Sequence, residues 1–201
     1  MYPWEHLLLG YLVVSLYTHI RYRSSPTAAQ TIAAVIGSQA PDLVDKPLAW
    51  SFGLVETGYA VGHSIFVAPG VILATAVLSR RVGRERSGVA FVLAYLSHLA
   101  SDIVYPLAHG RGIEPRVVLW PIASPPGSDI DGKFLDRTLY YFQRFYGEMT
   151  AGELTWFVAF QLSLAGGVLL LWMYDGAPVA NESFQWLRRR IQDLLAHVRV
   201  N

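Results

Sequence analysis

Residues 88–107, which read GVAFVLAYLSHLASDIVYPL, form an apolar run that two ionisable side chains interrupt, His98 and Asp102. The run has about 20 residues, the length that an α-helix needs to cross the hydrocarbon core of a membrane. Its ionisable residues are four positions apart, so they lie on one face of that helix, one turn apart. Because an ionisable group at membrane depth is costly, it usually serves a function and has a partner nearby. The run therefore predicts a transmembrane helix that carries a functional site.

The composition of the whole chain also favours a membrane protein. Hydrophobic residues make up 53% of the 201 residues and charged residues 15%, against roughly 25% charged in average soluble domains. The formal net charge of +1 argues against a nucleic-acid-binding protein, which would need a basic face. Because the sequence has no cysteine, any metal ion must be held by His, Asp and Glu, which suit zinc, manganese or iron.

The hydrophobic pattern predicts an all-α integral membrane bundle with four to five transmembrane helices, in a single membrane domain over residues 1–201. Five apolar segments carry this prediction, at residues 7–20, 28–40, 58–78, 88–107 and 154–174. The last three are long enough to cross a membrane as helices, whereas the first two are shorter.

The single domain is expected to contain four parts. These are a helical bundle with the metal site (5–107), an extramembrane loop with an amphipathic helix (108–153), the last span (154–174) and an amphipathic carboxy-terminal helix (182–199). Both amphipathic segments combine apolar residues at helical spacing with charged residues, which is typical of helices that lie at a membrane interface.

Arginines follow the first, third and fifth apolar segments, at positions 21, 23, 80, 81, 84, 86 and 188–190. The positive-inside rule places these arginines on the cytoplasmic side, which leaves the amino terminus outside. The expected location is therefore the plasma or inner membrane, which the chain would cross several times. The lipid bilayer is the expected partner.

Four apolar segments supply candidate metal ligands, and all of them fall toward the same side of the membrane. Asp42, His63, His98 and Asp102 would offer two nitrogens and two or more oxygens to one divalent ion, a donor set that suits zinc, with manganese as an alternative. A carboxylate oxygen could bridge to a second ion bound by His6, so one or two ions are expected.

Two further residues have open roles. Asp45 could ligate, act as the general base, or orient a histidine from outside the ligand set. His109 follows Asp102 by seven residues on the same side, and is either a further ligand or an ordinary loop histidine.

These motifs together resemble the membrane-bound metal-dependent hydrolases, a family of bacterial and archaeal inner-membrane proteins. The resemblance covers about residues 5–122 and rests on the motifs His6, APD at 40–42 with Asp45, GHS at 62–64, His98-x-x-x-Asp102 and LWP at 119–121. The same order is distantly similar to the superfamily of zinc-dependent phospholipases C and single-strand nucleases, which cleave phosphoesters. This chain lacks a second His-x-x-x-acid pair after Asp102, so the resemblance implies a mononuclear or dinuclear site.

The expected function is that of a membrane-bound metal-dependent hydrolase, in which metal-activated water attacks a phosphoester or lipid-like substrate at the membrane face. Two alternatives stay open. A metal transporter or sensor would bind the same ion without chemistry, and would need polar residues at several depths. A non-catalytic structural membrane protein would use the same polar side chains as hydrogen-bonded ties between helices.

Overall fold

The computed structural model describes residues 1–127, 130, 132–152 and 155–200, and for Ala108 and residues 193–200 the backbone alone. Every regular element in this part of the chain is a helix, which confirms the all-α class. The α-helices are α1 (Pro3–Tyr22), α2 (Ala28–Trp50), α3 (Ala68–Arg81), α4 (Glu85–Val104), α5 (Phe134–Thr150), α6 (Trp156–Tyr174) and α7 (Ala180–Val200). Two short 3-10 helices follow α4, η1 (Tyr105–His109) and η2 (Pro115–Val118).

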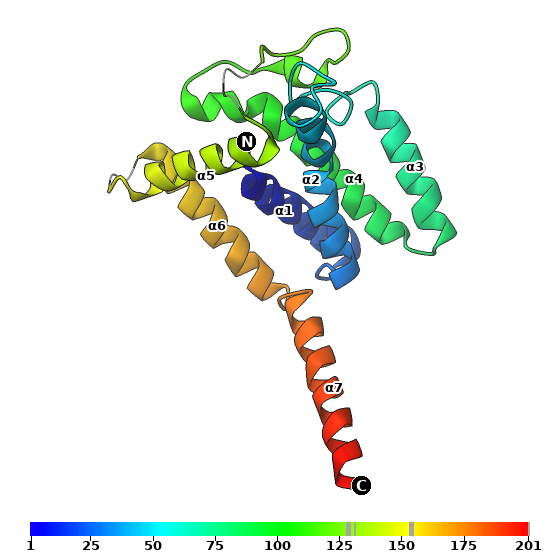
Figure 1. Ribbon diagram of the computed structural model, residues 1–201. Coiled ribbons are helices and arrows are strands. Elements are labelled where there is room, and N and C mark those ends of the chain that lie inside the picture. Colours follow the sequence, from blue (N-terminus) through cyan, green and yellow to red (C-terminus); the bar gives the residue numbers. More distant parts are fainter. Residues whose placement is uncertain (128–129, 131, 153–154, 201) are drawn as a thin grey trace.

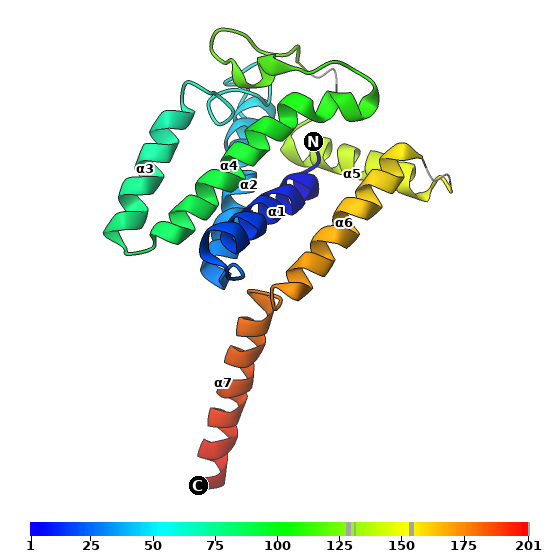
Figure 2. The ribbon, with the colours of Figure 1, turned by 180° about the vertical axis from the view of Figure 1, so that it is seen from behind.

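Helices α1, α2 and α4 pack against one another and form the centre of the bundle. As Figures 1 and 2 show, α3 lies on the outer side of α4, α6 lies beside α1, and α7 projects away from the bundle. Helix α5 crosses near the upper end of α6, on the same end of the molecule as the long connection that follows α4. The site-bearing ends of α1, α2 and α4 therefore meet beneath α5 and this connection.

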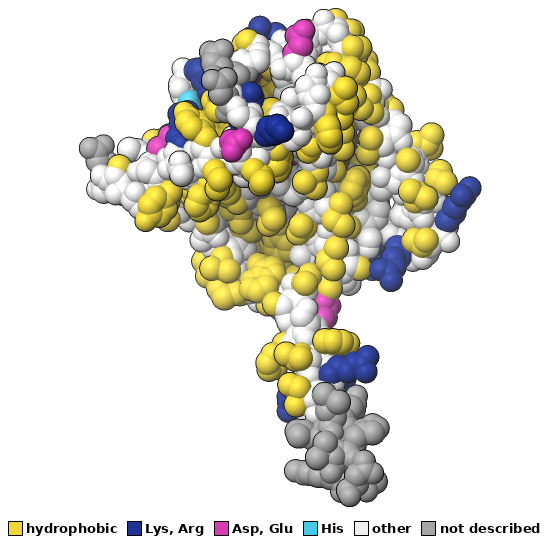
Figure 3. Space-filling model, in the orientation of Figure 1, with side chains coloured by type: hydrophobic (Ala, Val, Ile, Leu, Met, Phe, Trp, Pro, Cys, Tyr) yellow, Lys and Arg dark blue, Asp and Glu magenta, His cyan; other side chains and the backbone are white. Residues whose placement is uncertain are grey.

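Many of the buried side chains of the bundle are polar, and many of its large apolar side chains are exposed. Its fully buried side chains include Glu5, His6, Ser15, Ser38 and Asp45, whereas large apolar side chains of the same helices are exposed, among them Leu16, Ile20, Ile32, Ile36 and Leu43. Figure 3 shows apolar side chains over the middle of one face, with basic side chains gathered at the upper end, near the lower end of α3 and on α7. A surface of this kind is suited to a lipid environment, because lipid tails are as apolar as the side chains exposed to them.

Two glycines allow the central helices to come into close contact. A Cβ atom at Gly37 of α2 would lie 2.3 Å from the carbonyl oxygen of Phe91 in α4. A Cβ atom at Gly10 of α1 would lie 2.8 Å from the Cβ of Ser38. Small residues at such contacts are typical of helix packing in membranes, where close approach of the backbones supplies van der Waals attraction. Beside them Val14, Ala34, Ala90 and Ala94 form a small buried apolar cluster.

The expected number of four to five transmembrane helices is wrong. Only two helical stretches in the described residues are long and apolar enough to cross a membrane, 85–107 (α4 with the start of η1) and α6. Helices α1 and α2 are long enough, but the polar side chains that they turn inward lower their hydropathy. The expected third span, 58–78, is divided, because residues 51–67 form a loop and α3 has only 14 residues.

The last expected span and the carboxy-terminal amphipathic segment are both helical. Residue 154, where that span was expected to begin, lies outside the described residues, and α6 begins at Trp156. Only 17% of the apolar window of α6 is buried, which is unlike the core helix of a soluble protein. Helix α7 covers the expected segment 182–199, but part of its expected apolar face lies beyond Gln192, outside the described side chains.

Replacing Gly37 by alanine tests the close contact of α2 and α4. The added Cβ would meet backbone atoms of Phe91, which have no rotamer to change, so we expect destabilisation by about 1–3 kcal/mol. The measurement is the midpoint of thermal unfolding in detergent. Gly167→Ala in α6 is the matched control, because no atom lies within 4 Å of its added Cβ. Equal midpoints for both variants would contradict the packing described here.

Candidate metal centre

The structure brings five of the expected ligands together at one end of the bundle. His6 comes from α1, Asp42 from α2, His63 from the loop before α3, and His98 and Asp102 from α4. All five are buried, with at most 6% of each residue exposed. Two groups within the cluster could each hold a metal ion: Asp42, His63 and His98, and His6, His98 and Asp102.

The two histidines shared between Asp42 and Asp102 have nearly the spacing of ligands around one ion. The Nε2 atoms of His63 and His98 are 3.0 Å apart, and each lies 3.4 Å from Asp102 Oδ2. Asp42 Oδ1 lies 3.6 Å from Nε2 of His63 and 3.8 Å from Nε2 of His98. In a tetrahedral zinc site with bonds of about 2.0–2.2 Å, neighbouring ligand atoms lie roughly 3.3–3.6 Å apart. His63 and His98 therefore have, with either of the two carboxylates, about the separation that a common ion requires.

Hydrogen bonds of the two Nδ1 atoms fix which ring nitrogen faces this centre. His98 Nδ1 lies 2.6 Å from the carbonyl oxygen of Ser38, which can only accept a hydrogen bond, so Nδ1 donates. His63 Nδ1 lies 2.8 Å from Asp45 Oδ2, again an acceptor. With the proton on Nδ1, the Nε2 atom of each neutral ring presents its lone pair, as in most histidine metal sites with a supporting hydrogen bond.

His6 repeats this arrangement on the other side of Asp102. Ser101 donates its hydroxyl hydrogen to the carbonyl of His98, so its oxygen accepts from His6 Nδ1, 3.2 Å away. His6 Nε2 is buried without a hydrogen-bond partner and lies 3.3 Å from Asp102 Oδ1. The two oxygens of Asp102 thus face different histidines, and the amino-terminal ammonium of Met1 also donates to Oδ1, at 2.9 Å. A second ion held by His6 and Asp102 would take the place of this ammonium.

The middle of the cluster holds nitrogen lone pairs that repel one another. The Nε2 lone pairs of His63 and His98 face each other at 3.0 Å beside the carboxylates of Asp42 and Asp102, whose charge is offset in part by Lys46 and the Met1 ammonium. Burial lowers the pKa of His63, but its contacts with Asp102, Asp45 and Asp42 outweigh that effect and raise the pKa overall. A cation in the middle of the cluster, either a proton or a metal ion, relieves the repulsion, and the donor set fits a divalent metal ion.

Asp45 holds the loop that carries His63. Its carboxylate accepts hydrogen bonds from the backbone N–H groups of Ala60, Gly62 and His63, at 2.7, 2.8 and 3.0 Å, as well as from the ring of His63. Gly62 allows this turn, because a Cβ there would lie 2.8 Å from the carbonyl oxygen of Pro41. Of the roles expected for Asp45, the geometry favours orientation of His63, since its oxygens are already engaged and it is fully buried.

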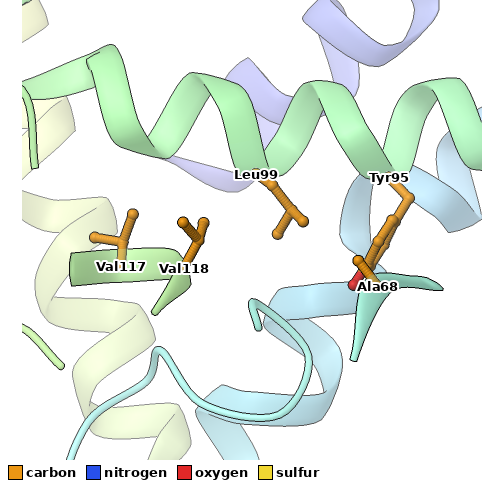
Figure 4. Close-up of a cluster of buried hydrophobic side chains, with 5 residues drawn as sticks. All are labelled: Ala68, Tyr95, Leu99, Val117 and Val118. Atoms are coloured by element: carbon orange, nitrogen blue, oxygen red, sulfur yellow. The ribbon is translucent and has the colours of Figure 1, made fainter. Parts of the chain in front are cut away.

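A buried apolar cluster fastens this loop to α4. Figure 4 shows Leu99 and Tyr95 extending from α4, with Val117 and Val118 of η2 on one side and Ala68 on the other. The Tyr95 hydroxyl donates to the carbonyl of Gly62, at 2.9 Å. Ser64 donates to the carbonyl of Trp120, at 2.6 Å, which links the GHS motif to the LWP motif. The two motifs are therefore parts of one structural unit around His63.

Two residues that the sequence analysis did not select stand at the edge of the cluster. Lys46 forms an ion pair with Asp42, four residues before it, a spacing that a helix pattern could have revealed. Tyr59 packs edge-on against the ring of His63, with ring centroids 4.9 Å apart. The charge of Asp102, then burial and the charge of Asp42, raise the pKa of Tyr59 well above its usual range, so its hydroxyl keeps its proton.

Two other histidines lie outside the metal-competent groups formed by the described residues. His109 is exposed in η1, and its ring packs against Tyr105 and Phe157. His19 belongs to a second polar cluster at the far end of α1, where Tyr11, Ser15 and His19 all contact the carboxylate of Asp175 at 2.7 Å. The hydrogen bonds of that cluster hold the end of α6 against α1. They join residues that are far apart in the sequence, so no local sequence pattern predicts them.

Substitution of Asp45 by asparagine tests the support of the His63 loop. The asparagine NH₂ group would face N–H donors, so we expect a loss of about 1–3 kcal/mol and faster hydrogen exchange at the amides of Ala60, Gly62 and His63. Hydrogen-exchange mass spectrometry on residues 58–64 measures this. Glu114→Gln, at an exposed ion pair with Arg116, is the control and should leave these amides unchanged. Unchanged exchange in Asp45→Asn would contradict the assigned support.

Comparison with known proteins gives one family. The family model described as YdjM inner membrane protein matches residues 1–177 of the chain. The matched part contains α1 to α6 and every residue of the cluster. No curated protein and no solved structure matches.

Proposed function

The chain belongs to the YdjM inner membrane protein family and is thus an inner-membrane protein, and from this premise we propose that it is a metal-dependent hydrolase of phosphoesters. The observation that carries the proposal is the convergence of three histidine Nε2 atoms on the carboxylate of Asp102. Buried, preoriented nitrogens of this kind cost stability when no cation satisfies them, so a purely structural role explains them poorly.

The main site would use Asp42, His63, His98 and Asp102, and His6 would share Asp102 at a second position. Zinc fits this set of nitrogen and oxygen donors best, with manganese as the alternative. When bound in such a site, a divalent ion lowers the pKa of water and polarises a phosphoryl oxygen, which is the chemistry of phosphoester hydrolysis.

The remaining residues of the cluster would position these groups. Asp45 and the Ser38 carbonyl hold the rings of His63 and His98 by their Nδ1 atoms, so that both Nε2 atoms stay in place. Asp42 also lines a pocket that opens beside the cluster, whereas Asp45 does not. A substrate in this pocket would therefore reach the cluster past Asp42.

Metal content and hydrolysis, measured together, test the proposal. The wild-type protein, purified in mild detergent, should hold one or two zinc or manganese ions per chain by elemental mass spectrometry, and should hydrolyse an aryl phosphate ester. His98→Ala and Asp102→Ala each remove a ligand atom and should lose both the metal and the activity.

His109→Ala is the matched control, because the structure places His109 outside the cluster, and it should keep the metal. A folded wild-type protein that takes up no metal after zinc or manganese is added would overturn the proposal. Metal binding without hydrolysis of any phosphoester would overturn its catalytic part.

One observation favours a second candidate, a metal transporter. Buried polar residues also occur away from the metal cluster, at Thr18 in the last part of α1 and at Gln30 and Thr31 in the first turn of α2. Between these residues and the metal cluster, Val14, Ala34, Ala90 and Ala94 form an apolar layer along the three central helices, which would have to open for an ion to pass. Metal-dependent flux into proteoliposomes would support transport, and its absence with intact metal binding would exclude it.

A further inference from the structure

A pocket of about 560 Å³ lies beside the metal cluster, beneath α5. The start of α1, the end of α2, the loop at 56–59 and α5 form its walls. Asp42 and Lys46 stand where the pocket meets the cluster, since both line the pocket and Asp42 also contacts Nε2 of His63. Any molecule in this pocket would thus have one end within reach of the cluster.

The polar part of this pocket is basic. Lys46, Arg111, Arg137 and Arg144 line it, against the carboxylates of Glu56 and Asp42. Arg144 pairs with Glu148, whereas no carboxylate in the described part of the chain pairs with Arg137. Lys46 Nζ and the guanidinium carbon of Arg137 each lie 5.6 Å from the ring centroid of Trp50. The indole therefore holds two cations in the same wall, close to Asp42.

The other walls are aromatic, and one of them continues to the apolar surface of the molecule. Helix α5 turns Phe134, Arg137 and Tyr141 toward the pocket, whereas Leu135, Leu139, Phe142 and Tyr146 form its exposed apolar face. Phe142 belongs to both, because it lines the pocket and is exposed. An amphipathic helix with such a face lies at the interface of a bilayer, so the pocket mouth beside Phe142 would open at the depth of the lipid headgroups.

We propose that this pocket binds a lipid phosphate, with the phosphate between Lys46 and Arg137 and the acyl part leaving past Phe142 into the bilayer. The proposal names the substrate class of the hydrolase and rests on that function. Arginine matches the geometry and charge of a phosphate group and also interacts with the face of an aromatic ring, as Arg137 does with Trp50. Arg137 acts here as a specificity residue, since it contacts the substrate and lies outside the cluster of metal ligands.

Binding of short-chain lipids to the wild-type protein in detergent tests this proposal without requiring turnover. The probes are a phosphatidic acid and a diacylglycerol of equal chain length, which lacks the phosphate, and the readout is the change in tryptophan fluorescence, because Trp4 and Trp50 line the pocket. We expect the phosphatidic acid to bind about tenfold more tightly, the effect of one charge-assisted hydrogen bond. Glycerol 3-phosphate, which carries the same phosphate without acyl chains, should bind more weakly still.

Substitutions at Arg137 separate this proposal from that of the metal site. Arg137→Ala should lose about tenfold in affinity for the phosphatidic acid and Arg137→Lys much less, whereas metal content should stay at the wild-type value in both. Arg81→Ala, at the end of α3 and away from the pocket, is the control and should change neither quantity.

Equal affinity for the two lipids, or an unchanged affinity in Arg137→Ala, would overturn the lipid-phosphate pocket while leaving the metal site intact. If glycerol 3-phosphate binds as tightly as the phosphatidic acid, the claim that the bound phosphate belongs to a lipid is wrong. Selective binding by a protein that holds no metal would overturn the hydrolase and leave the pocket standing.

Discussion

Each histidine of the cluster is held by its Nδ1 atom, and the rest of the site depends on these three contacts. The acceptors are the Ser38 carbonyl for His98, the Asp45 carboxylate for His63 and the Ser101 hydroxyl for His6. Because every Nδ1 proton is directed away from the centre, every Nε2 lone pair is directed toward it, beside two carboxylates. The fold thus brings nitrogen lone pairs and two carboxylates together in a buried place, and Lys46 and the Met1 ammonium contact the carboxylates rather than the lone pairs. A bound cation is the simplest way to offset the repulsion between these lone pairs.

The distribution of polar residues follows from the same requirement. The three central helices turn their polar side chains inward to build the cluster at one end and the Asp175 cluster at the other. Their outward faces are left with leucine, isoleucine and valine, which suit a lipid environment. Small residues such as Gly10 and Gly37 then bring the backbones close enough for polar groups of different helices to meet. The polar site and the apolar outer surface therefore both result from the inward placement of polar side chains on the central helices.

Much of the site could be predicted from the sequence because a helix has a fixed period. The spacing of His98 and Asp102 places both on one face of α4, and the structure brings Asp42, His63 and His6 to that face. The number of spans could not be read in this way. Residues 58–64 are apolar enough to suggest a helix, but their backbone N–H groups bind the Asp45 carboxylate, a contact between distant segments that no local pattern reveals. The position of His109 outside the cluster likewise depends on its contacts with Tyr105 and Phe157, the second of them a distant residue that no local pattern reveals.

The most direct test of the central claim is X-ray absorption at the zinc K edge, measured on the purified zinc-loaded protein. The account predicts nitrogen and oxygen ligands at about 2.0–2.1 Å and the outer-shell scattering of at least two imidazole rings. It also predicts that His63→Ala binds less zinc and that any zinc it retains gives a weaker imidazole signal, because the Nε2 atom of His63 lies within 3.4 Å of both His98 Nε2 and Asp102 Oδ2. A spectrum of oxygen ligands alone, without imidazole scattering, would contradict it.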